Sequence, residues 1–185
     1  FCNLTPEQAE LYQQITTDML NRVENADGIR RRGLILAGLT RLKQVCDHPR
    51  LVIPDDKSGL EGRSGKCERL VEMLEEVIEA GDAALVFTQY RTMGHLLEKA
   101  IADRLRVPTL FLHGGTPATM RDTMIARFQS DEVGKPRIFI LSLRAGGLGL
   151  NLTAANHVFH FDRWWNPAVE NQATDRACLL YTSDA

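Results

Sequence analysis

The sequence lacks several features that would place it in a specialised class of protein. Its four cysteines are scattered, with no CxxC pair, which favours free thiols over disulfides or a zinc site. It has no apolar run of the roughly 18 residues that a membrane-spanning helix needs, and no secretory signal. The net charge of −2 gives no globally basic surface, so any contact with nucleic acid has to be local. We therefore expect an intracellular protein without a membrane partner.

The chain has 185 residues, of which 44% are hydrophobic. That length and composition suit one globular domain, or one domain with a helical extension. The sequence opens on Phe1 rather than on methionine, so we expect it to be part of a longer protein.

Residues 1–53 are expected to form a helical segment. Thr5 and Gln8 have the spacing of a capping box around Pro6, which is typical of a helix start. A second helix is predicted over residues 34–46, ending before His48-Pro49. Between the two helices, Arg30-Arg31-Arg32 either contacts a DNA backbone or forms a solvated helix start. Helical spacing predicts an inward face made by Leu11, Tyr12, Ile15, Met19 and Leu20, and then by Ile35, Leu39, Leu42 and Cys46.

Residues 54–65 form a polar linker and the expected domain boundary. The stretch from Gly62 to Cys67 has some likeness to a nucleotide-binding P-loop, but the spacing fails. Leu60 stands where the first glycine belongs, Cys67 replaces the serine or threonine, and no strand precedes the loop. We therefore do not interpret it as a P-loop.

Residues 66–177 alternate between strand and helix patterns. This alternation predicts an α/β domain with a parallel sheet that is covered by helices on both faces. Two helices are predicted over residues 67–80 and 92–105. A third is predicted to have Thr116 as its cap and Pro117 in its first turn, and its expected buried residues are Met120, Met124, Ile125 and Phe128. The predicted strands are 83–87, 109–112, 137–141 and 156–161.

Unusual residues follow all four predicted strands. Right-handed crossovers bring the carboxyl ends of parallel strands to one edge, where open α/β sheets bind ligands. Gly146, Gly147 and Gly149 allow the backbone to approach a phosphate closely, although a tight turn would use the same glycines. The residues expected at this edge are Thr88-Gln89-Tyr90, His113-Gly114-Gly115, 142–151 and 162–167.

Three of these stretches resemble motifs V, Va and VI of the Swi/Snf family. They are 145–153 (AGGLGLNLT), 162–167 (DRWWNP) and 172–176 (QATDR), and the resemblance extends over roughly positions 4 to 177. The family comprises DNA-translocating ATPases of helicase superfamily 2. The resemblance implies a RecA-like C-terminal motor lobe of the P-loop NTPase type, preceded by the helical segment. It implies ATP with Mg²⁺ as cofactor, with the Mg²⁺ bound mainly by residues of a missing N-terminal lobe. It also implies double-stranded DNA as a partner and nucleoprotein complexes as further partners.

The resemblance also assigns roles to individual residues. Arg176 is the expected catalytic arginine. The expected nucleotide-binding residues are Gly147, Gly149, Gln172 and Asp175. The expected DNA-binding residues are Thr88, Gln89, Tyr90, Gly114, Gly115, Arg121, Arg144 and Asn151. The residues expected to couple hydrolysis to movement are Asp162, Trp164, Trp165 and Asn166. No metal ligand is expected: His157 and His160 lie an odd number of residues apart on a strand and so face opposite sides.

The match to the family stops after Ala177. Leu179 stands where the family has a second arginine, so we expect residues 178–185 to be a divergent or foreign tail. We expect the isolated chain to hydrolyse little ATP. One alternative is a non-catalytic interaction or DNA-binding module that keeps the lobe fold. A small α/β enzyme with another substrate is a third hypothesis, which is disfavoured because no nucleophile–base pair is evident.

Overall fold

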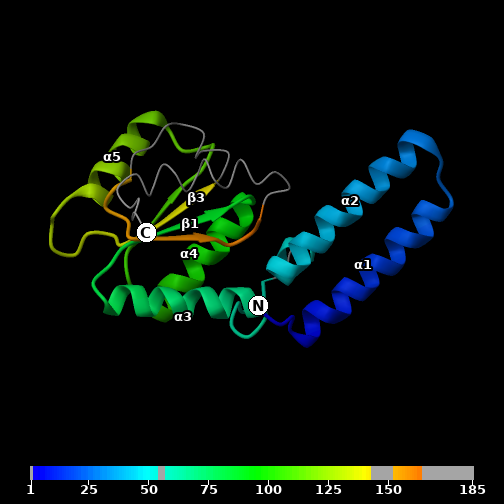
Figure 1. Cartoon of the computed structure of the whole chain (residues 1–185), viewed down its shortest axis with the longest axis horizontal. Helices are drawn as coiled ribbons and strands as arrows, with labels where there is room; N and C mark the ends of the chain where they lie inside the picture. The colour runs from blue at the N-terminus through cyan, green and yellow to red at the C-terminus, as the bar shows by residue number, and fades with distance from the viewer. Residues whose placement is uncertain (1, 54–56, 143–151, 164–185) are drawn as a thin grey trace, which may run out of the picture. The chain divides into compact units, whose positions relative to one another are not determined.

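The computed structural model describes residues 2–53, 57–142 and 152–163 (Figure 1). The chain divides into two compact units, residues 1–69 and residues 70–185. The predicted boundary at 54–65 stays a prediction. None of the helices in the described ranges combines the length and the apolar character needed to cross a membrane.

The first unit is built on a helical hairpin. Helix α1 (Pro6–Glu24) and helix α2 (Gly28–Asp47) lie side by side, and Ile15, Leu42 and Val45 are buried in their core (Figure 1). The predicted capping box is confirmed, because Gln8 N donates to Thr5 Oγ1 at 3.2 Å and Thr5 N donates to Gln8 Oε1 at 3.1 Å.

Two details of the hairpin differ from the sequence-based prediction. Helix α2 begins at Gly28 rather than at residue 34, so Arg30-Arg31-Arg32 is exposed helix. Tyr12, Leu20 and Ile35 were expected to face inward but are 38%, 51% and 36% exposed. Periodicity identifies the apolar side of a helix, but it does not show how much of that side a neighbouring element covers. Each helix of a hairpin covers only a narrow stripe of the other.

A polar cluster closes the end of this unit opposite the hairpin turn. Asp47 is buried, and its Oδ1 lies 2.7 Å from Lys66 Nζ. The Ser64 hydroxyl donates to the Asp47 carbonyl at 2.6 Å and accepts from Cys67 N at 3.2 Å. The stretch that has some likeness to a P-loop is therefore the capped start of helix α3 (Gly65–Glu79). Beside it, burial lowers the pKa of His48 to about 4, so the ring is neutral and its Nδ1 accepts from Arg50 N.

The second unit contains the predicted parallel sheet. Its described strands are β1 (Ala84–Thr88), β2 (Thr109–Leu112), β3 (Ile138–Ser142) and β4 (His157–His160), all parallel in the order β2-β3-β1-β4. Every residue of β1 and β3 is buried, as expected for central strands with both faces covered.

Helices α4 (Arg91–Leu105) and α5 (Ala118–Gln129) pack on opposite faces of this sheet. On one face, Phe128 of α5 joins Leu85, Phe87 and Phe139 in the core. On the other face, Gly94 of α4 lies against the ring of Phe111. Successive strand residues point to opposite faces, which explains why neighbouring strand positions contact different helices.

The start of α5 corrects two sequence-based expectations. Thr116 does not cap the helix, because Pro117 holds the cap position and the Thr116 hydroxyl instead accepts from His113 N at 3.1 Å. Met120 was expected to be buried but is 50% exposed. The short strand β2 lies at an edge of the described sheet, so it covers only part of α5.

Gly94 provides a test of how tightly α4 packs. A Cβ atom at this position would lie 2.1 Å from Phe111 Cζ, inside a buried core. We expect Gly94→Ala to destabilise the second unit by about 1–3 kcal/mol, because the ring has to move out of a packed position. Thermal unfolding measures the effect, with Thr92→Ala on the exposed side of α4 as the matched control. Equal midpoints for the two variants would contradict this packing.

Candidate functional site

The four described strands end level with one another. In the hydrogen-bonded register Thr88 pairs with Ser142, Phe87 with His160, and Leu112 with Leu141. The segments that follow the strands therefore start at one edge of the sheet. This confirms the shared edge that the sequence predicts, and we call it the carboxyl edge.

Asp162 connects the ends of two neighbouring strands. Its side chain is 1% exposed and follows β4 by two residues. Asp162 Oδ2 accepts from Thr88 Oγ1 at 2.5 Å, and Oδ1 accepts from Gln89 N at 2.8 Å. Hydrogen bonds to a carboxylate are stronger than those between neutral groups, so this contact fixes the end of β1 against the segment after β4.

The three residues after β1 differ in their access to solvent. Thr88 is fully buried, and its hydroxyl points at Asp162. Gln89 is half-buried, and its side-chain amide donates to the Arg163 carbonyl at 2.7 Å. Tyr90 is half-buried at the start of α4. Gln89 and Tyr90 thus reach the surface of the edge, whereas Thr88 supports it from inside.

The loop between β2 and α5 is ordered by its own polar groups. Gly115 N donates to His113 Nδ1 at 3.0 Å, and Thr116 N donates to the His113 carbonyl at 2.9 Å. Arg121 Nε donates to the Thr116 carbonyl at 2.8 Å, and within the described residues its two terminal guanidinium nitrogens have no hydrogen-bond acceptor. Gly114 is exposed, and a Cβ at this position would meet nothing within 4 Å.

Arg91 is a residue of this edge that the sequence reasoning missed. Its Nη1 lies 3.3 Å from the place that a Cβ on Gly115 would occupy. Burial and then the neighbouring Arg91 and His95 lower the pKa of His113. A neutral His113 is what the Gly115 N–H needs as an acceptor. Its proximity to Gly115 is a tertiary contact, for which the sequence carries no local signature.

Arg91, Gly114 and Arg121 therefore gather on one side of the carboxyl edge. Two guanidinium groups beside an exposed glycine are suited to binding a phosphate group, because arginine donates in a planar fork and glycine allows close approach. A contact of this kind reaches phosphate oxygens and reads no bases.

The remaining predicted site residues lie outside the described residues. They are Arg144, Gly147, Gly149, Asn151, Trp164, Trp165, Asn166, Gln172, Asp175 and Arg176. Their roles stay predictions. Within the described ranges, no three histidine, cysteine, aspartate or glutamate side chains are placed to hold a metal ion. His157 Nε2 lies 3.0 Å from Asp82 Oδ2, and the His160 ring stacks on Phe87 at 5.3 Å between centroids.

Comparison with known proteins identifies the family. The helicase conserved C-terminal domain family matches residues 65–178. The SWI2/SNF2 ATPase core of Sulfolobus solfataricus in complex with double-stranded DNA superposes with a TM-score of 0.82, at 41% identity over 95% of this chain and 36% of that chain. The chain belongs to the helicase C-terminal domain family, in its Swi/Snf branch. The C-terminal domain of the same SWI2/SNF2 ATPase gives a TM-score of 0.80 at 44% identity, over 92% of this chain and 73% of that chain.

Curated relatives extend the family match to whole proteins. The Bacillus subtilis (strain 168) protein YwqA is 47% identical over 96% of this chain. The DNA repair and recombination protein RAD26 of Saccharomyces cerevisiae is 35% identical, also over 96% of this chain. The chain spans only 19% of YwqA and 16% of RAD26. The Swi/Snf helicase domain thus corresponds to one part of much longer relatives, and its RecA-like fold is the fold of that part.

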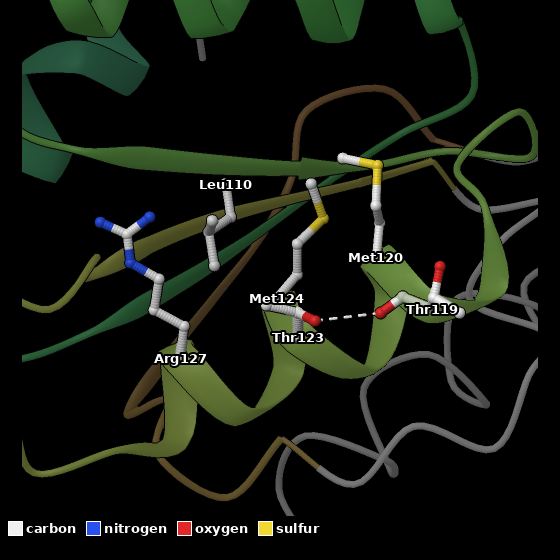
Figure 2. Close-up of a pocket in the computed structure, with 6 residues that line it drawn as sticks. All are labelled: Leu110, Thr119, Met120, Thr123, Met124 and Arg127. Carbon is white, nitrogen blue, oxygen red and sulfur yellow. Dashed lines mark hydrogen bonds between the residues drawn. The ribbon is translucent and has the colours of Figure 1, made fainter.

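A cavity of about 330 Å³ in this helicase domain is lined by residues of α5 and β2 (Figure 2). Figure 2 shows Met120 and Met124 pointing from α5 toward Leu110 of β2. Thr119, Thr123 and Arg127 complete its lining, and the Thr123 hydroxyl donates to the Thr119 carbonyl at 3.0 Å. None of the predicted site residues lines this cavity, and neither does Arg91.

The Asp162 contact predicts a measurable coupling within the Swi/Snf domain. We expect Asp162→Asn to destabilise the second unit by about 1–3 kcal/mol, because an amide offers one acceptor where the carboxylate offers two. Thr88→Val is the partner variant, since it removes the hydroxyl but keeps the shape. Urea unfolding of the single variants and the double variant gives the coupling. Additive effects would contradict a direct contact between the two side chains.

Proposed function

We propose that this domain is the C-terminal motor lobe of an ATP-dependent translocase on double-stranded DNA. The observation that supports the proposal is the carboxyl edge, where Arg91 and Arg121 reach the loop that carries Gly114 and where Asp162 fixes the end of β1. A Swi/Snf relative whose structure was determined with double-stranded DNA supports the same partner. Nucleoprotein complexes are the proposed targets of the full-length protein.

The proposed DNA contact is made to the backbone. Arg121 donates to phosphate oxygens through its terminal nitrogens, while its Nε bond to the Thr116 carbonyl fixes the orientation of the guanidinium group. Gly114 and Gly115 allow the strand to approach the loop closely. Gln89 and Tyr90 extend the contact along the edge, and Thr88 acts from inside by positioning Asp162. Arg144 and Asn151 are proposed as further DNA-binding residues. Such a contact follows any sequence, which is what a translocating motor needs.

The proposed ATP site lies between this lobe and a second, N-terminal lobe. Gly147, Gly149, Gln172 and Asp175 contribute to nucleotide binding, and Arg176 stabilises the charge that develops on the transferred phosphoryl group. Asp162, Trp164, Trp165 and Asn166 couple the nucleotide state to the DNA contact. The phosphate-binding lysine and the magnesium ligands belong to the N-terminal lobe, so this lobe alone is proposed to turn over little ATP.

A non-catalytic module is the second candidate, and one observation favours it. Leu179 replaces an arginine that the Swi/Snf motif has at this position. A lobe without that arginine retains the fold and the DNA-binding edge but loses part of the transition-state stabilisation, which in phosphoryl transfer is worth roughly 10³–10⁵ in rate.

The DNA contact predicts a change in salt dependence. We expect Arg121→Ala in the full-length protein to weaken binding to a DNA duplex of any sequence, by about tenfold at low salt. The slope of log K against log salt should fall by about one, because one phosphate contact is lost. Fluorescence anisotropy measures both quantities. Arg127→Ala is the matched control, since Arg127 lies on the same helix but lines the cavity of α5 and β2. An unchanged slope for Arg121→Ala would remove it from the DNA contact.

ATP turnover decides between the motor and the module. We expect the full-length protein with Leu179→Arg to show turnover that duplex DNA stimulates, and the protein with Leu179 to be slower by more than about 100-fold. Arg176→Ala in the Leu179→Arg background should abolish turnover while ATP binding persists. Equal stimulated turnover with leucine and arginine would make the second arginine dispensable. No turnover in either protein, although both fold and bind ATP, would leave the non-catalytic module.

A further inference from the structure

The side of α2 that faces away from α1 has an unusual surface. Residues at positions i, i+4, i+7 and i+11 of a helix lie on one side. In α2 this spacing selects a stripe on the side opposite the buried Leu42 and Val45. We call this stripe the outer face of α2, and it consists of Ile29, Gly33, Leu36 and Thr40.

Two large apolar side chains of the outer face are open to solvent. Ile29 is 90% exposed and Leu36 is 65% exposed, one on each side of Gly33 along the helix. The Thr40 hydroxyl donates to the Leu36 carbonyl at 2.9 Å, so its polar group is already satisfied within the helix. The stripe therefore presents mainly apolar atoms, which gain free energy when a partner removes them from water.

Gly33 has no explanation within the described structure. A Cβ there would meet nothing within 4 Å, whereas a Cβ on Gly38 of the same helix would lie 2.2 Å from Met19 Sδ. Gly38 is thus required by the packing of α1 on α2. A glycine in a helix interior destabilises the helix, so Gly33 needs another reason, and the close approach of a second chain to the outer face is one.

Charge identifies the chemistry of that second chain. Helix α2 carries Arg30, Arg31, Arg32 and Arg41, and Asp47 at its last position is its single acidic residue. Arg30 and Arg32 lie on either side of the apolar stripe, and both are exposed. Within the described ranges, neither of these two arginines forms an ion pair. Cationic side chains in the first turns of a helix are also disfavoured by the helix dipole, and an acidic partner would remove that disadvantage.

We propose that the outer face of α2 is a docking site for an amphipathic helix of another protein, apolar along one stripe and acidic along its flanks. Its apolar side chains would cover Ile29 and Leu36, and its backbone would approach at Gly33. Its carboxylates would pair with Arg30 and Arg32. DNA fits this surface less well, because phosphates gain nothing from exposed isoleucine and leucine side chains. The site goes beyond the proposed translocase activity and does not depend on it.

Photo-crosslinking in the native host tests the proposal on the full-length protein. A benzoylphenylalanine at the exposed position of Ala37, beside the stripe, should form adducts with one segment of another protein. Mass spectrometry of the adduct should show a segment with an apolar helical stripe and acidic flanks. The same crosslinker at Gln13, which is exposed on α1, is the control for unspecific capture.

Two variants separate docking from folding. Gly33→Leu should raise the unfolding midpoint of the hairpin, since leucine is the better helix former and has space there, yet should reduce the adduct about tenfold. Arg30→Glu with Arg32→Glu should reduce it similarly, and Thr17→Glu on exposed α1 should not. Four results for the protein without these substitutions would overturn the proposal: an adduct with DNA, an adduct with a second copy of this protein, an adduct with a segment lacking acidic flanks, or no adduct above the Gln13 control.

An adduct whose yield Gly33→Leu leaves unchanged would overturn the proposal as well.

Discussion

The buried carboxylate of Asp162 is the contact on which the carboxyl edge of the sheet depends. It follows β4, an outer strand of the described sheet, and it accepts hydrogen bonds from the side chain of Thr88 and the backbone of Gln89. A parallel sheet aligns strand ends only approximately, because its ladder bonds stop where the strands stop. The Asp162 contact continues the alignment past the last ladder bond. The segments that carry Gln89, Tyr90 and Arg91 therefore start from a fixed point beside β4.

The two arginine-bearing surfaces differ in what surrounds their charges. At the carboxyl edge, Arg121 is oriented by a backbone carbonyl and lies near exposed glycines, so a small, strongly charged oxyanion fits. On α2, arginines lie beside exposed Ile29 and Leu36, so a ligand has to offer carboxylates and apolar surface together. The neighbours of an arginine, rather than the arginine itself, distinguish a phosphate site from a protein-docking site.

Much of the fold follows from local patterns in the sequence. The continuous apolar runs predict the four described strands, and the Thr5–Gln8 capping box predicts the start of α1. The patterns fail where the extent of a neighbour decides burial, as for Tyr12, Leu20 and Met120. They also fail at Thr116, where a competing bond to His113 N takes the hydroxyl away from the helix start. At the site, the parallel strands bring Gly114 to the edge as expected, whereas the bond of Arg121 to the Thr116 carbonyl was not foreseen. Arg91 was missed because its proximity to Gly115 is a tertiary contact without a local signature.

The strand order also determines when the sheet first forms as the chain is made. Strand β1 pairs with β3 and β4, and β2 pairs with β3, so β1 and β2 are not neighbours. No ladder bond of the described sheet is possible until Ile138–Ser142 has left the ribosome. Until then two apolar strands and the helices α4 and α5 are present without the central strand that joins them. The nascent chain thus passes through a long stage in which its strand edges are unpaired, and such edges are prone to aggregation. Synthesis of this domain therefore leaves β1 and β2 without a strand partner until three quarters of the chain, about 140 residues, has been made.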